Sequence, residues 1–142
     1  MPLDDPLERR LSEAERVALL DLPLPAVFST VATNGSVHSV PIHFVFIDDA
    51  FRFIAEGGSV KVLNARRTGR GTLCVTATVD GERRYVAAEG AVRIEDGIEQ
   101  ADLDALDRRY GRDPGSADDE AYADTVTLVL RPERWLGNAD LD

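Results

Sequence analysis

AVFSTVATNGSVHSVPIHFVF, residues 26–46, is the stretch that decides the fold class. Two runs rich in β-branched and aromatic residues flank Asn34-Gly35, the dipeptide that most strongly favours a two-residue hairpin turn. The second run is interrupted by Pro41, which cannot donate to a strand ladder, so we expect an edge, a bulge or a bend there. The stretch therefore predicts an antiparallel hairpin.

Further β-prone runs follow along the chain and are separated by turn signals at residues 48–49 and 80–81. They lie at residues 51–54, 72–79, 84–94 and 125–130. Hairpin connections between about six strands indicate an antiparallel sheet that closes on itself. We expect a mainly β, α+β fold, a six-stranded antiparallel split barrel with flanking helices.

An N-terminal helix is predicted by Ser12 and Glu15, which have the spacing of a capping box, and by prolines that end the helix at residues 23 and 25. Ser59 can cap a second helix that runs to about residue 67 and is closed by Gly69. Asp96 can cap a third helix that ends at Gly111.

The chain has 142 residues, which suits a single domain over 1–142, with a helix and lead-in over 1–25 and an acidic surface loop over 112–124. The formal net charge of -10 argues against nucleic acid and against an anionic membrane surface as partners. No signal-peptide pattern or apolar run of membrane-spanning length is seen, so we expect a cytoplasmic protein.

The residue types that build metal and hydrolase sites are scarce. Cys74 is the only cysteine, and His38 and His43 are the only histidines, so we expect no metal site. No nucleophile elbow, phosphate-binding loop or dinucleotide fingerprint is found. Hydrolase chemistry is therefore not supported.

The segment GGSVKVLNARR, residues 57–67, is the best candidate for a binding site. It holds Lys61, the only lysine of the chain, within the first turn of the expected helix. Ser59 and free backbone N–H groups at a helix start can bind an anion, and Asn64 falls on the same face as Lys61. Taken alone, the pattern also fits a plain Gly-Gly turn before a surface helix with solvated charges.

In order and spacing, these features resemble the pyridoxamine 5'-phosphate oxidase-like split-barrel superfamily. Within it the chain looks most like the actinobacterial flavin/deazaflavin oxidoreductases that use coenzyme F420, and especially their biliverdin reductase-like group. The matching segments are the hairpin, PIHFVF (41–46), SVKVLNARR (59–67), YVAAEGAV (85–92) and RWLGNADL (134–141). A cationic cluster for a second phosphate is not found, which argues against a true pyridoxamine-phosphate oxidase.

The resemblance implies a homodimer with two cofactor sites at its interface, each lined by both chains. It places Ser59, Lys61 and Asn64 near the cofactor phosphate. The residues expected beside the ring are Thr30, Ala32, Val40, Pro41, Ile42 and His43. Charge complementarity suggests that Arg66 and Arg67 meet an acidic oligoglutamyl tail.

The activity implied is transfer of a hydride from reduced F420 to a conjugated small-molecule acceptor, for example a tetrapyrrole such as biliverdin, or a quinone. His43 is a candidate proton donor, beside His38, an arginine or water. Two alternatives stay open: an FMN-dependent oxidoreductase of the same superfamily, and a non-catalytic split-barrel protein that carries a cofactor or haem.

Overall fold

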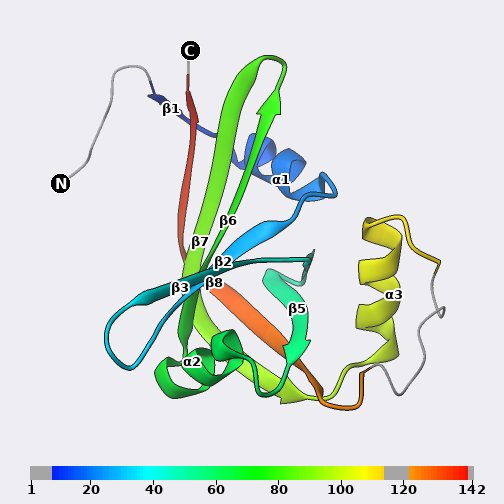
Figure 1. Ribbon diagram of the computed structural model, residues 1–142. Helices are drawn as coiled ribbons and strands as arrows, with labels where there is room; N and C mark the ends of the chain where they lie inside the picture. Colours follow the sequence, from blue (N-terminus) through cyan, green and yellow to red (C-terminus); the bar gives the residue numbers. More distant parts are fainter. Residues whose placement is uncertain (1–7, 114–121, 141–142) are drawn as a thin grey trace.

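A computed structural model describes residues 8–113 and 122–140. Its eight strands form one antiparallel sheet in the order β3-β2-β6-β7-β8-β5-β4, with β1 paired to β8 (Figure 1). The strands are β1 (Glu8–Arg10), β2 (Ala26–Val31), β3 (Val37–Ile42), β4 (Val45–Ile47), β5 (Ala50–Glu56), β6 (Arg70–Val79), β7 (Glu82–Asp96) and β8 (Thr125–Asp140). The expected antiparallel split barrel is confirmed.

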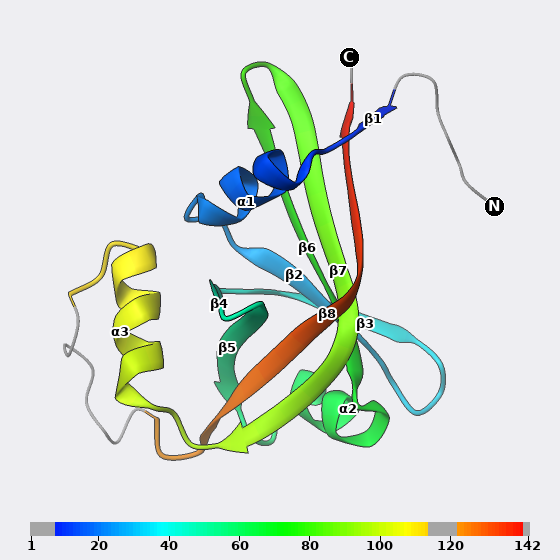
Figure 2. The same ribbon diagram turned by 180° about the vertical axis from the view of Figure 1, so that it is seen from behind.

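Three helices flank the barrel in the described part of the chain: α1 (Glu13–Asp21), α2 (Val60–Thr68) and α3 (Gln100–Arg109). Helix α2 lies at one end of the barrel and α1 toward the other, while α3 stands to the side (Figures 1 and 2). Most of the predicted acidic loop, residues 114–121, lies outside the described residues.

The predicted hairpin joins β2 to β3, but its turn is longer than two residues, because the last strand pair is Val31↔Val37 and only Gly35 of the Asn-Gly pair has a positive φ. The Gly35 N–H donates to the Ala32 carbonyl at 2.9 Å, and Gly35 has φ +84°, a conformation that glycine adopts without a steric penalty. The two strands then pair in register from Ala26↔Ile42 to Val31↔Val37. The turns at residues 48–49 and 80–81 are confirmed, with positive φ at Asp48, Asp49 and Asp80.

Eight strands form where six were expected. The run after the hairpin divides into β3 and β4 after Ile42, and Pro41 lies within β3, which is at the edge of the strand order, one of the positions expected for this proline. A short β1 adds to β8, whose pairing continues past Pro132 to Asp140. A register shift at Glu89/Gly90 accommodates that proline, so the expected strand end at residue 130 was wrong.

Gly90 is required at this bulge because the backbone of β8 passes very close to it. A Cβ at residue 90 would lie 1.9 Å from the Arg131 carbonyl oxygen. No side chain fits at such a distance. The Glu-Gly pair of the sequence is therefore a packing requirement of the β7–β8 wall.

Of the three predicted N-caps, one is confirmed and two differ, while Gly69 closes α2 as predicted. The Ser12–Glu15 capping box forms, with both backbone-to-side-chain hydrogen bonds at 3.0–3.1 Å. Ser59 is the N-cap residue of α2, but its hydroxyl donates to the Glu56 carbonyl instead of capping the helix. Asp96 remains in β7, where it pairs with Val126, so α3 begins later, after Glu99.

The core fills the barrel and contains four phenylalanines that are at most 1% exposed: Phe28, Phe44, Phe51 and Phe53. Phe28 and Phe53 pack edge to face with their ring centroids 4.8 Å apart. These rings join β2 to β5 across the barrel. The core thereby fixes the strands that carry the cavity described next.

Candidate functional site

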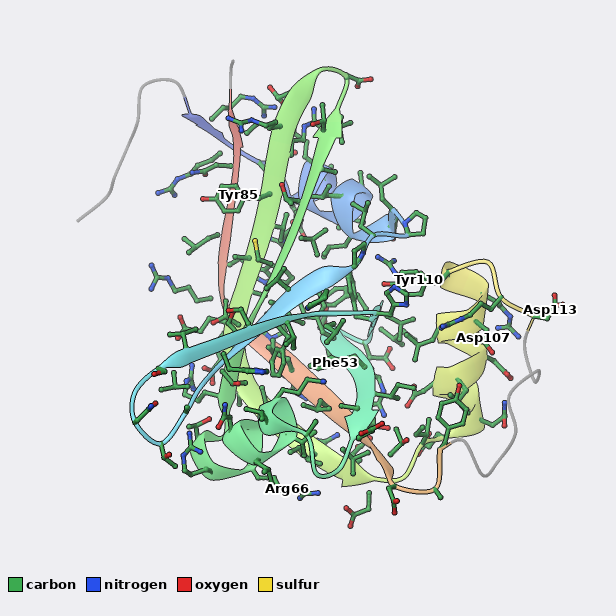
Figure 3. The ribbon with its side chains drawn as sticks, viewed as in Figure 1. Phe53, Arg66, Tyr85, Asp107, Tyr110 and Asp113 are labelled. Carbon is green, nitrogen blue, oxygen red and sulfur yellow. The ribbon has the colours of Figure 1, made fainter. Side chains whose placement is uncertain are left out.

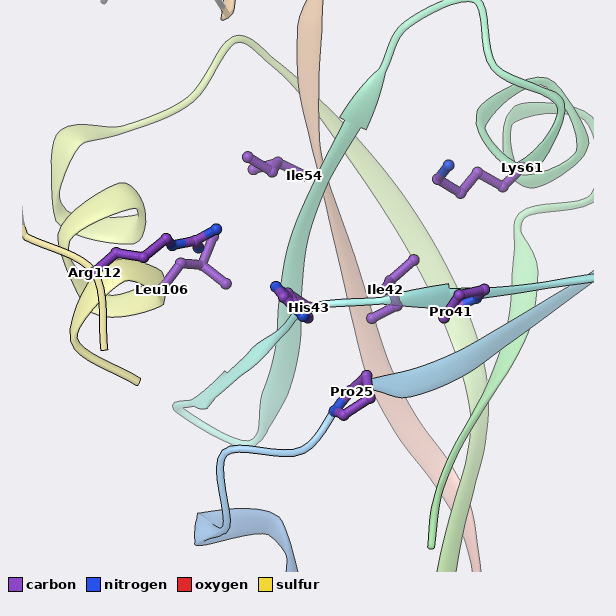
Figure 4. Close-up of a pocket in the computed structure, with 8 residues that line it drawn as sticks. All are labelled: Pro25, Pro41, Ile42, His43, Ile54, Lys61, Leu106 and Arg112. Carbon is purple, nitrogen blue, oxygen red and sulfur yellow. The ribbon is translucent and has the colours of Figure 1, made fainter. Parts of the chain in front are cut away.

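A cavity of about 380 Å³ opens between α2 and α3, over the ends of β3 and β5. Its lining is apolar in the middle and cationic at both ends. Figure 4 shows Lys61 reaching in from α2 and Arg112 from the segment after α3, with His43 and Ile42 between them. The lining residues are Pro25, Pro41, Ile42, His43, Ile54, Lys61, Leu106 and Arg112.

The α2 end of the cavity is held by a buried amide. Asn64 is 4% exposed, and its Nδ2 donates to the Thr30 Oγ1 at 3.1 Å. Its Oδ1 accepts from Arg67, whose other terminal nitrogen donates to the Val31 carbonyl. These contacts fasten α2 to β2, and Lys61 projects from the first turn of that fixed helix into the cavity.

The remaining cations of this region have partners of their own. Arg70 lies 2.6 Å from the Glu133 carboxylate and 3.4 Å from that of Glu89. Arg66 is exposed and lies 3.6 Å from Asp96. Of the arginines after Asn64, Arg66 is thus the most loosely held.

His43 forms part of the cavity wall and stacks on Tyr110. The two ring centroids are 4.0 Å apart and the planes differ by 14°. Burial lowers the pKa of His43, and the nearby positive charges of Arg112 and Arg109 lower it further. The imidazole is therefore neutral at pH 7, and its protonated form is a stronger acid than ordinary imidazolium.

Tyr110 also fastens the end of α3 to the barrel (Figure 3). Its hydroxyl accepts from the Phe44 N–H at 3.0 Å and donates to the Leu24 carbonyl at 2.9 Å. The neighbouring Arg109 donates to the carbonyls of Leu20 and Leu22 at 2.6 Å each. The α3 end of the cavity is thus attached to the segment that joins α1 to β2.

The first turn of α3 is held by an ion-pair cluster. Arg52 on β5 donates to both oxygens of the buried Asp102 at 2.8–3.1 Å and to Glu95 at 2.6 Å. Asp102 is 7% exposed, and Arg52 supplies hydrogen bonds to both of its carboxylate oxygens. Both ends of α3 are therefore fixed, and Leu106 between them faces the cavity.

Four of the eleven residues expected at the cofactor line this cavity: Pro41, Ile42, His43 and Lys61. The structure uses Thr30, Asn64 and Arg67 to attach α2, and Val40 packs against the core. Ala32 lies in the hairpin turn, Ser59 bonds to Glu56, and Arg66 points to Asp96. No sequence motif pointed to the α3 side of the cavity, where Leu106 comes from the third predicted helix and Arg112 from the predicted surface loop.

His38 lies opposite Thr30 in the β2–β3 pairing. Its Nδ1 is buried and has no hydrogen-bond partner among the described residues. Within residues 8–113 and 122–140, no three His, Cys, Asp or Glu side chains group as metal ligands would. In the same residues, no helix is both long and apolar enough to span a bilayer.

The strand order and the flanking helices define a split barrel. Residues 12–139 match the family model of pyridoxamine 5'-phosphate oxidase. The chain therefore belongs to the pyridoxamine 5'-phosphate oxidase family, as the resemblance indicated.

Solved structures share the fold at low sequence identity. A conserved hypothetical protein from Mycobacterium tuberculosis has a TM-score of 0.76 and 20% identity, over 92% of this chain and 86% of that one. An F420 reductase has a TM-score of 0.71 and 23% identity, over 83% and 93%. A FAD-binding protein from Mesorhizobium loti has a TM-score of 0.75 and 16% identity, over 94% and 98%. The comparison with curated proteins gives no match.

Proposed function

We propose that the protein is an F420-dependent oxidoreductase that transfers a hydride from the reduced deazaflavin to a conjugated small-molecule acceptor. The observation that carries the proposal is the cavity between α2 and α3, where the only lysine of the chain stands beside an apolar strand surface. Membership of the oxidase family and the fold shared with an F420 reductase support it.

The residues present fit such a cofactor. Lys61 supplies a point charge for a phosphate, next to free N–H groups at the start of α2. Pro41 and Ile42 offer an apolar edge against which a planar ring can lie. The volume is at the low end of the range for small-molecule sites, so the cavity suits a ring, with the tail of the cofactor extending outside it.

When bound, a reduced deazaflavin supplies a hydride, that is two electrons and one proton nucleus, to an electron-poor carbon. The chain's own residues would hold and orient the reacting groups, and the apolar side chains of Ile54 and Leu106 would cover part of a bound ring. His43 is the candidate donor of the proton that the acceptor takes up after it has received the hydride. Its lowered pKa makes the imidazolium a stronger acid but a scarcer one at neutral pH.

FMN is the second candidate cofactor, and one observation favours it. FMN has a phosphate but no oligoglutamyl tail, so it needs no extended cationic surface. Arg67 and Arg70 are already engaged in internal contacts, and this leaves Arg66 as the freest of the three arginines. The phosphate anchor at Lys61 serves both candidates equally.

We also propose that two copies associate through the outer face of β2 and β3, so that each cofactor site is lined by both chains. Val27, Val31 and Val37 are 45–67% exposed on that face. Val27 pairs with Pro41, so the apolar face reaches the rim of the cavity. Sedimentation equilibrium tests this: wild type should be a dimer and Val27→Glu should be a monomer, whereas a monomeric wild type contradicts it.

The experiment that tests the function is a titration of the purified protein with F420 and, separately, with FMN, followed by cofactor fluorescence. Tight binding of F420 and weak binding of FMN supports the proposal and leads to an acceptor screen that begins with biliverdin. Preference for FMN moves the protein to the second candidate. Binding of neither contradicts both and favours a non-catalytic carrier, which haem titration then tests.

A further inference from the structure

The cavity has a second cationic end that the proposed cofactor does not use. Lys61 marks the α2 side, and Arg112 marks the opposite side, beyond Ile54 and Leu106 (Figure 4). A cofactor phosphate held at Lys61 leaves Arg112 facing whatever shares the cavity with the ring. In a hydride transfer, the molecule that must lie beside the ring is the acceptor.

The Arg112 guanidinium is oriented by one carboxylate. Its Nε lies 3.1 Å from the Asp107 Oδ1, and the Asp107 side chain is 12% exposed whereas that of Arg112 is 51% exposed. The guanidinium also lies 5.9 Å from the centroid of the Tyr110 ring. Among the described residues, Asp107 is the only carboxylate paired with Arg112, and the 3.1 Å contact is made through Nε.

A guanidinium held at its Nε edge presents two terminal nitrogens, the geometry that matches the two oxygens of a carboxylate. The surroundings favour an anion here despite the net charge of -10. Burial lowers the pKa of His43, and the positive charges of Arg112 and Arg109 lower this pKa further. The local potential at this end of the cavity is therefore positive.

We propose that the acceptor is a planar conjugated molecule with a carboxylate group, and that Arg112 binds this carboxylate while the apolar middle of the cavity holds the conjugated body. The inference rests on the proposed function, because it assigns the Lys61 end to the cofactor. It makes Arg112 a specificity-determining residue for the acceptor.

The test uses a planar acid, 2-naphthoate, and its neutral counterpart 2-naphthamide, titrated by calorimetry into the protein without cofactor. Wild type should bind the acid about tenfold more tightly than the amide. Arg112→Ala should bind the two about equally, because only the acid loses a charged partner. Arg108→Ala is the matched control: it removes one exposed cation from the same helix end and should keep the preference.

Three results would overturn the proposal: Arg112→Ala keeps the preference, Lys61→Ala abolishes it instead, or wild type binds neither compound at millimolar concentration. Melting temperatures confirm that each variant is folded, and Arg112→Gln replaces Arg112→Ala if the latter is not. The readout needs no cofactor. A protein that binds neither F420 nor FMN but shows Arg112-dependent acid binding therefore refutes the proposed function alone.

Discussion

The two ends of the cavity present similar charges but are built differently. At the α2 end, Lys61, Asn64 and Arg67 lie within one helix, and the side chains of Asn64 and Arg67 attach that helix to β2. At the α3 end, Tyr110 and Arg109 reach carbonyl and amide groups that lie 66–89 positions earlier in the chain. The first end follows from a short segment of sequence, whereas the second exists only once the chain has folded.

Because the two ends are built differently, substitutions at each end should have different effects. A change at the α2 end should affect cofactor binding and the attachment of one helix. A change at the α3 end should affect the acceptor side and the position of α3. A change in the wall shared by both ends should disturb them together.

The largest effect is expected from Gly90→Ala, which tests the shared wall. Its Cβ would lie 1.9 Å from the Arg131 carbonyl oxygen, so β7 and β8 must separate. We expect a loss of about 3 kcal/mol or more in the free energy of unfolding, measured by urea denaturation. Gly81→Ala is not a suitable control because of its positive φ, but Gly58→Ala, where the added Cβ meets nothing within 4 Å, is. Equal stability of Gly90→Ala and wild type would contradict the bulge geometry.

Asn64→Ala should come next and should affect the α2 end. It removes the hydrogen bonds to Thr30 and from Arg67 and leaves the 2%-exposed Thr30 hydroxyl without this donor. We expect a loss of about 2 kcal/mol in the free energy of unfolding. Leu63→Ala, on the exposed side of the same helix, should stay within about 0.5 kcal/mol of wild type. If both variants were equally stable, Asn64 would not attach the helix.

Tyr110→Phe should have a smaller effect, confined to the α3 end. The ring can still stack on His43, but the hydroxyl that bonds to Phe44 and Leu24 is lost. We expect a loss of about 1 kcal/mol in stability. Amide hydrogen exchange should increase in α3 and remain unchanged in α2. Faster exchange in both helices would mean that the two ends are not independent.

The smallest effect concerns the pKa of His43. Arg112→Ala removes a positive charge that disfavours the imidazolium, so the pKa should rise toward its ordinary value while burial still holds it below. An NMR titration of the His43 ring measures the change. Arg108→Ala serves as the control and should shift the pKa less. An unchanged value in Arg112→Ala would remove the argument for a positive potential at this end.

The sequence predicted what depends on neighbouring residues. The Asn34-Gly35 and Asp80-Gly81 turns and the Ser12–Glu15 capping box formed because their hydrogen bonds and φ values are local. Strand β8 was predicted too short because Pro132 is a strand breaker by itself. Only the bulge opposite Gly90 lets the pairing continue.

The residues of the candidate site also differ in whether neighbouring residues or distant contacts determine their position. Pro41, Ile42, His43 and Lys61, four of the residues predicted to contact a cofactor, line the cavity, and they belong to segments whose pattern is recognisable in the sequence. Arg112 was placed in a surface loop, and the start of α3 was placed at Asp96 rather than after Glu99. The sequence around Arg112 does not show that Tyr110 stacks on His43, which follows β3. This contact is what brings Arg112 to the cavity.

Lys61 is proposed to anchor the cofactor at the α2 end, and the decisive measurement is a fluorescence titration of wild type and Lys61→Ala with F420. Loss of a charged phosphate contact should weaken F420 binding about tenfold. Lys61→Arg should retain most of the affinity, Arg108→Ala should retain all of it, and the melting temperature should not change. Equal F420 affinity in wild type and Lys61→Ala, or a lower melting temperature with unchanged affinity, would contradict the account and leave Lys61 a structural residue.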